Sequence, residues 1–284
     1  CGRSGEDALS DCLNERGLPS FNHNRQTLRI VTGLERRYAA FDGLNLCWET
    51  LEGIAKHNGP VHGDLAVEME ALLGDFDLEL HTHASAEAQV AALSDDIAYN
   101  THDVDDGLRA GLLDFDALWE VALPARALAA IDRDFPGLPA DRRAFEVARR
   151  MISELVGDVL TQSRLLLAQS GAQSAADVRS LETPVIAFSA AIFADLQELR
   201  AFLFHQLYRH PQVNRRRKKT TQIIRDLFEL YDARPNLLLG EAGMAEAMDN
   251  AVARAGVVTD TIASMTDKAA IEEHRRQFDL YSVD

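Results

Sequence analysis

Five aspartates lie within twelve residues of one segment, together with a tyrosine and a histidine. The segment runs from Ser94 to Arg109, and its acidic residues are Asp95, Asp96, Asp103, Asp105 and Asp106. On a helix, Asp95, Tyr99 and Asp103 recur every four positions, so their side chains form a wall about 12 Å long on one side. A row of carboxylate and phenol oxygens can bind a metal ion or the hydroxyl groups of a polar ligand.

The small residues around this wall decide between two interpretations of it. Ala91, Ala92 and Ala98 indicate that part of the helix is buried. Buried carboxylates of like charge are costly unless a cation or hydrogen-bond donors compensate them. The pattern therefore favours a metal or polar-ligand site, and a solvated acidic helix face is the alternative.

The histidines are weaker candidates. His81 and His83 would share one side of an extended segment, but no cysteine or third histidine lies at ligand spacing, so loop histidines are the preferred interpretation. His57 ends a predicted helix, where its positive form would stabilise the helix dipole. His23 and Asn24 stand at a predicted helix start, where N-capping by Asn24 and anion binding are compatible.

One dense basic run interrupts an acidic sequence, from Arg215 to Lys219. Five consecutive cations cannot all face one way on a helix, so the run predicts a solvated surface. The alternative is an anion site shared with Arg209 and His210 at a subunit interface. The sequence contains no GxGxxG, P-loop or GxSxG motif, which removes the commonest dinucleotide-binding, Walker-type and serine-hydrolase interpretations.

Helical periodicity dominates the elements that must position these residues. Apolar side chains recur at spacings of three and four, and β-like alternation is confined to residues 78–82. An all-α fold is therefore predicted. The segment 171–182 is the best candidate for a domain boundary. It predicts an N-terminal helical domain, 1–170, and a C-terminal helical domain, 171–284. Helices are predicted at 24–41, 46–57, 84–113, 141–170, 186–208, 211–232, 244–255, 257–266 and 267–279.

Composition limits the function further. The chain has 284 residues, 46% of them hydrophobic, and 29 basic against 45 acidic residues give a net charge of −16. This charge argues against general binding to nucleic acid or anionic membranes, so a phosphate-bearing ligand needs a local basic patch or a divalent cation. Three cysteines without a CxxC pair predict a reducing, cytoplasmic location, and the apolar runs are too short for a membrane span.

Five blocks of the sequence resemble one known family. They are GEDAL (5–9), the block at 21–60 that contains ETLEGIAKHNGP, the block at 84–112 that contains DDIAYNTHDVDD, FLFHQLYRHPQV (202–213) and MTDKAAIEEHRRQFD (265–279). The chain resembles the bacterial deoxyguanosinetriphosphate triphosphohydrolase-like proteins of the HD-domain superfamily. The resemblance implies an all-α, HD-domain-like phosphohydrolase fold and hydrolysis of a deoxynucleoside triphosphate to deoxynucleoside and triphosphate. It also implies a homo-oligomer with nucleotide activation.

The resemblance assigns roles to the acidic wall. The family holds a divalent metal ion such as Mg²⁺ or Mn²⁺ with a His, a His-Asp doublet and a later Asp, and the later Asp matches Asp95 here. Tyr99 and Asp103 match the residues that pack against the deoxyribose and bond its 3′-hydroxyl. A second, looser match makes Arg200 and Tyr208 candidates for contacts with the phosphates and the nucleoside.

Two candidate catalytic residues come from the N-terminal blocks. Glu6 matches an acid that partners a family histidine, and His23 matches a position near the phosphates, with Asn24 as a further substrate-binding candidate. Where the family reads Phe-Gly-His, this chain reads Cys1-Gly2-Arg3, and the other metal ligands of the family lie upstream. We therefore expect that a segment precedes Cys1 and that the chain alone hydrolyses dGTP at background rate. The alternative is a non-catalytic helical nucleotide-binding or assembly protein that has lost its metal site.

Overall fold

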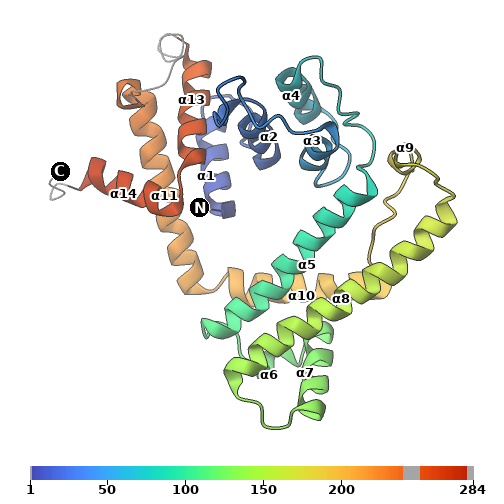
Figure 1. Cartoon of the computed structure of the whole chain (residues 1–284). Coiled ribbons are helices and arrows are strands. Elements are labelled where there is room, and N and C mark those ends of the chain that lie inside the picture. The colour runs from blue at the N-terminus through green and yellow to red at the C-terminus, as the bar shows by residue number, and fades with distance from the viewer. Residues whose placement is uncertain (1, 239–249, 280–284) are drawn as a thin grey trace. The chain divides into compact units, whose positions relative to one another are not determined.

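The computed structural model describes residues 2–238 and 250–279 of the chain, and these residues form helices and connecting loops without a β-strand (Figure 1). The predicted all-α fold is confirmed. Cys1 and the part of the predicted 244–255 helix up to residue 249 lie outside the described residues. None of the described helices has a run of apolar residues long enough to cross a membrane.

The chain divides into two compact units. The first unit combines Cys1–Gln26 with Pro211–Asp284, and the second unit is Thr27–His210. The division falls inside helix α2 (His23–Arg29) at one end and before helix α11 (Pro211–Ala233) at the other. The predicted domain boundary between residues 170 and 171 lies within the second unit. The division into domains 1–170 and 171–284 stays a prediction.

In the first unit, helix α1 (Gly2–Asn14) packs against α11 because both helices present an apolar face. Helices α13 (Ala251–Ser264) and α14 (Asp267–Phe278) also pack on α11, and the short η3 (Pro235–Leu238) follows it (Figure 1). Among its described residues, one apolar core contains these buried side chains: Ala8, Leu9, Cys12, Leu13, Ile224, Leu227, Phe228, Tyr231, Ala255, Val258, Ile262 and Ala270.

The second unit is built around helices α5 (Ala86–Arg109) and α8 (Ala140–Ser170), which pack against each other (Figure 1). Its main core fills the space between these two helices and α6 (Phe115–Leu118), α7 (Ala122–Asp134) and α10 (Ala190–Leu203) with leucine, isoleucine, valine and methionine side chains. The remaining elements of the unit are η1 (Ile30–Leu34), α3 (Trp48–Ala55), α4 (Asp64–Leu73), α6 (Phe115–Leu118), α7 (Ala122–Asp134), α9 (Ala175–Arg179), α10 (Ala190–Leu203) and η2 (Phe204–Tyr208).

Local sequence signals define the ends of α5, the helix of the acidic wall. The Ser85 hydroxyl caps the first turn by accepting a hydrogen bond from the Ala88 N–H at 3.3 Å. The chain leaves the helix at Gly111, whose φ of +64° favours glycine. Gly107 has a different role, because a β-carbon there would lie 2.5 Å from the Leu113 side chain. Gly107 therefore allows the following loop to pack on the helix.

The predicted helix over 24–41 is wrong beyond residue 34. Helix α2 passes into the π-helix η1, and the chain becomes extended at Glu35. It then turns back, because the Leu44 N–H donates to the Val31 carbonyl at 2.8 Å. Gly43 has a φ of +77°, and a β-carbon there would lie 2.5 Å from the Thr32 carbonyl oxygen, so only glycine fits this close approach.

Candidate functional site

The predicted wall lies on one long helix, but its three side chains differ in exposure. Asp95, Tyr99 and Asp103 all belong to α5. The Asp95 side chain is 76% exposed and Tyr99 is 48% exposed, whereas Asp103 is half-buried. Of the alanines that predicted burial, Ala91 is exposed and Ala92 and Ala98 are half-buried. The wall is therefore open at the Asp95 end and enclosed at the Asp103 end.

Tyr208 closes the Asp103 end of the wall. Its hydroxyl donates a hydrogen bond to the Asp103 carboxylate, and its ring centroid lies 6.4 Å from that of Tyr99. Burial and the hydrogen bond to Asp103 raise the pKa of Tyr208 far above its usual range. Burial also raises the pKa of Asp103, and the hydrogen bond from Tyr208 offsets part of this effect. The proton of the pair thus belongs to Tyr208, and Asp103 remains an acceptor.

Arg200 contacts the same helix at Asp96, the residue that follows Asp95. Its guanidinium donates to the Asp96 carboxylate, and both side chains are 34% exposed. Asn100 fixes this carboxylate from the other side, because its amide donates to Asp96 Oδ1 at 3.1 Å and to the Asp96 backbone carbonyl at 2.6 Å. The two predicted binding residues outside α5, Arg200 and Tyr208, are thus brought to the wall by α10 and η2.

The π-helix η2 explains how two residues eight positions apart reach one face. In an α-helix, Arg200 and Tyr208 would point about 80° away from each other. A π-helix winds more residues into each turn, so each residue between 204 and 208 rotates the chain less. The two side chains therefore align with Asp96 and Asp103. These two residues are seven positions apart on α5, so their directions around the helix axis differ by only about 20°.

His57 meets the open end of the wall. Its Nε2 lies 3.7 Å from Asp95 Oδ2, although the sequence favoured a role for His57 at the end of α3. His57 also lines a cavity of about 710 Å³ whose other polar lining residues include Glu49, Thr50 and Arg179. No sequence signal indicated this contact, because His57 and Asp95 come together only through the packing of α3 on α5.

The described residues do not form a complete metal site. Among them, no group of three or more His, Cys, Asp or Glu side chains lies close enough to hold a metal ion. Asp95 and His57 offer at most two ligands of a suitable chemical type. The metal therefore stays a prediction that rests on Asp95 and the family resemblance.

Glu6 and His23 form a pair within the first unit. The Glu6 carboxylate lies 3.0 Å from His23 Nδ1 and accepts the His23 backbone N–H at 3.2 Å. The carboxylate thereby orients the ring. The predicted N-cap is wrong: Asn22 accepts from the Arg25 N–H at 3.0 Å, whereas Asn24 is buried inside α2. The substrate-binding role of Asn24 stays a prediction.

A buried ionic network in the second unit was not predicted. Glu52 and Lys56 on and after α3 have fully buried side chains, and their charged groups lie 3.1 Å apart. Arg179 of α9 donates two hydrogen bonds to Glu52, at 2.7 and 3.0 Å, and its guanidinium lies over the Trp48 ring. Lys56 also donates to the Thr82 hydroxyl at 2.7 Å. The network connects α3, α9 and the segment after α4.

The other charged candidates have structural contacts. His83 Nε2 lies 3.2 Å from the Glu182 carbonyl, and neither His81 nor His83 belongs to a metal-binding group in the described part of the chain. In the basic run, Arg217 donates to the Ser4 hydroxyl at 3.1 Å on α1, and the neighbouring Arg215, Arg216, Lys218 and Lys219 are exposed. Most of the run is thus a solvated helix face.

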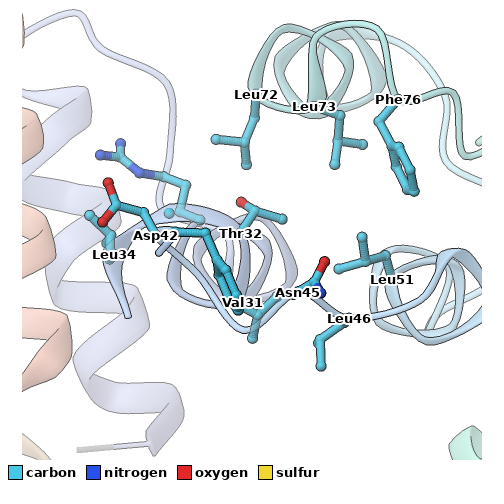
Figure 2. Close-up of a pocket in the computed structure, with 13 residues that line it drawn as sticks. Val31, Thr32, Leu34, Asp42, Asn45, Leu46, Leu51, Leu72, Leu73 and Phe76 are labelled. Carbon is cyan, nitrogen blue, oxygen red and sulfur yellow. The ribbon is translucent and has the colours of Figure 1, made fainter. Parts of the chain in front are cut away.

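A further cavity of about 560 Å³ contains none of the predicted site residues. In Figure 2, Leu72, Leu73 and Phe76 lie on one side of it, opposite Val31, Leu46 and Leu51. Its lining is thus mainly apolar.

The raised pKa of Asp103 predicts a measurable effect on stability. A carboxyl whose pKa is raised on folding favours the folded state only at low pH, and this contribution is lost as the pH rises through the folded pKa. We expect Asp103→Asn to unfold at a higher temperature than the wild type at pH 7, with a difference that shrinks towards about pH 4. Thermal unfolding followed by circular dichroism measures this difference. Glu120→Gln, an exposed residue, is the control, and an unchanged or lowered melting temperature at pH 7 would contradict the expectation.

Comparison with known proteins identifies relatives along almost the whole chain. Residues 186–276 match the model of the phosphohydrolase-associated domain. A deoxyguanosinetriphosphate triphosphohydrolase-like protein of Jannaschia sp. (strain CCS1) is 49% identical over 277 residues, which are 97% of this chain and 69% of the relative. A protein of the same name from Cereibacter sphaeroides (strain ATCC 17025 / ATH 2.4.3) is 46% identical over 97% of this chain and 72% of the relative. Another from Caulobacter sp. (strain K31) is 48% identical over 98% of this chain and 71% of the relative.

Proposed function

Because this chain belongs to the family of deoxyguanosinetriphosphate triphosphohydrolase-like proteins, we propose that it takes part in the hydrolysis of a deoxynucleoside triphosphate to deoxynucleoside and inorganic triphosphate. One observation supports this proposal most directly. Arg200 and Tyr208, the candidates for phosphate and nucleoside contacts, reach the same α5 surface that carries Asp95, Tyr99 and Asp103. The coarser assignment, a phosphohydrolase, rests on the family itself.

The chemistry and spacing of the wall suit a 2′-deoxy nucleotide. Asp103 would accept a hydrogen bond from the 3′-hydroxyl, while the Tyr99 ring would pack against the sugar and leave little room for a 2′-hydroxyl. Arg200 would pair with phosphate oxygens, because its guanidinium presents several N–H donors in one plane. The nearby cavity of about 710 Å³ falls in the size range of small-molecule sites.

The reaction needs an attack by water on the α-phosphorus and a proton for the departing 5′-oxygen. A histidine that a carboxylate orients can act as a general acid, and Glu6 holds His23 at Nδ1 in this way. An arginine side chain does not give up its proton near neutral pH, so Arg3, which stands where the family has a histidine, cannot take this role. His23 is therefore the proposed general acid of this chain.

The proposal is tested by sugar discrimination. We expect Asp103→Asn to lower kcat/KM for dGTP about 10- to 100-fold, because it weakens a charge-assisted hydrogen bond. Tyr99→Ala should instead lower the ratio of kcat/KM for dGTP over GTP, because it opens space for a 2′-hydroxyl. The measurement is the release of triphosphate from both nucleotides by the intact, active protein or an active homologue and by the same variants of it. An unchanged ratio in Tyr99→Ala together with full activity in Asp103→Asn would show that the wall does not bind the sugar.

A second candidate function follows from the incomplete set of metal ligands in the described residues. A non-catalytic nucleotide-binding protein would keep the sugar wall without hydrolysing its ligand. Binding of dGTP by the intact protein without release of triphosphate would identify this function.

A further inference from the structure

The contacts of Asp96 go beyond what a surface ion pair requires. Both carboxylate oxygens are engaged, Oδ2 by Arg200 and Oδ1 by the Asn100 amide. Asn100 is 1% exposed, so the amide that holds Asp96 is itself fixed inside the protein. A carboxylate held at both oxygens has one orientation, and it imposes one orientation on the guanidinium that it binds.

The backbones on both sides of this contact are rigid. On α5, Asp96 is flanked by the buried Ile97, and on α10, Arg200 is flanked by Leu199 and, one turn later, by Leu203, which are fully buried. The remaining freedom of Arg200 is the rotation of its long side chain. Fixing such a side chain on ligand binding costs free energy that a preformed contact removes in advance.

We propose that Asp96, held by Asn100, is a positioning residue that keeps the Arg200 guanidinium beside the wall for the phosphate chain of the nucleotide. This inference rests on the proposed function, because it assumes that Arg200 meets phosphate. It assigns to Asp96 a role that differs from that of its neighbour Asp95: Asp96 acts only through Arg200 and does not touch the ligand.

The test is a double-mutant cycle on binding, which needs no turnover. Inorganic triphosphate is titrated by calorimetry into wild type, Asp96→Ala, Arg200→Ala and the double variant. We expect Asp96→Ala to raise the Kd about 2- to 10-fold when Arg200 is present and to have no further effect in the Arg200→Ala background. Deoxyguanosine, which lacks phosphates, should bind all four proteins equally.

Two further variants separate positioning from a loss of structure. Asp195→Ala removes a carboxylate from the same helix α10, where Asp195 pairs with Arg126 at 2.6 Å, and it should leave the Kd of triphosphate unchanged. If Asp96→Ala does not fold, Asp96→Asn keeps the shape of the side chain and removes its charge, and it should raise the Kd less but again only when Arg200 is present.

The possible results distinguish this inference from the proposed function. Tighter binding in Asp96→Ala would mean that Asp96 competes with phosphate for Arg200, and an equal effect of Asp96→Ala with and without Arg200 would mean a general structural role. Either result overturns the inference and leaves the proposed function standing. If the wild type binds neither triphosphate nor deoxyguanosine, this result contradicts both the proposed function and the positioning role of Asp96.

Discussion

In the intact, active protein, Asp95→Ala is expected to reduce the release of triphosphate from dGTP to background while the helical circular dichroism spectrum stays largely unchanged. The Asp95 side chain is 76% exposed and lies near His57, so its removal costs little stability. Because of its place at the head of the wall and its match to the family's metal-binding Asp, we expect activity to depend on Asp95 more than on any other residue of the wall.

The measurement has two parts, triphosphate release and binding of Mn²⁺, and both should be lost together. Asp106→Asn removes another exposed carboxylate from the same helix, and this variant should retain both triphosphate release and Mn²⁺ binding. Full activity of Asp95→Ala would remove Asp95 from the catalytic centre, and lost activity with normal Mn²⁺ binding would remove it from the metal site alone.

Glu52→Gln is expected to destabilise the second unit by about 3–5 kcal/mol, because it leaves two cations without their common carboxylate. The Glu52 and Lys56 side chains are fully buried, and Arg179 is 13% exposed. Burial alone would raise the pKa of Glu52, but the hydrogen bonds and charges of Arg179 and Lys56 outweigh it and hold the pKa below its ordinary value. Stability from this group is therefore present above that ordinary value and is lost as the pH falls through the lowered folded pKa.

Thermal unfolding at pH 7 should show a decrease of about 6–20 °C for Glu52→Gln. Lys56→Met should lower the melting temperature less than Glu52→Gln does, because Glu52 keeps its two hydrogen bonds from Arg179. Glu49→Gln, an exposed carboxylate on the same helix, should change the melting temperature little. If Glu52→Gln lowers the free energy of unfolding by less than about 1 kcal/mol, the buried ionic network contributes little to the stability of this region.

Periodicity predicted the helices that have one clear apolar face and few interruptions. The predicted 141–170 and 211–232 segments closely match α8 and α11. It failed where a tertiary contact overrides the local pattern, as at residues 35–41, where the chain turns back because Gly43 can lie against η1. No pattern singled out α1, α4 or α7, and the pattern predicted two helices where α13 runs without a break from Ala251 to Ser264.

The candidate site shows the same limit. The i, i+4 spacing alone placed Asp95, Tyr99 and Asp103 on one face, because it depends only on helix geometry. The contact of Tyr208 with Asp103 spans 105 residues and could be anticipated only from the family resemblance. The pair Glu52 and Lys56 has the spacing of an ordinary exposed ion pair, so nothing local distinguishes it from a surface contact; its burial depends on Trp48 and Arg179.

The composition of the first unit from both ends of the chain has a consequence for biosynthesis. Helix α1 is translated before its packing partner α11, and all of Thr27–His210 is translated between them. At about 5–20 residues per second, this interval lasts about 10–40 s. During that time the apolar face of α1 has no native partner from α11, while the second unit can already fold as a contiguous segment. The nascent chain therefore exposes Leu9 and Leu13 to chaperones and proteases until the ribosome reaches α11.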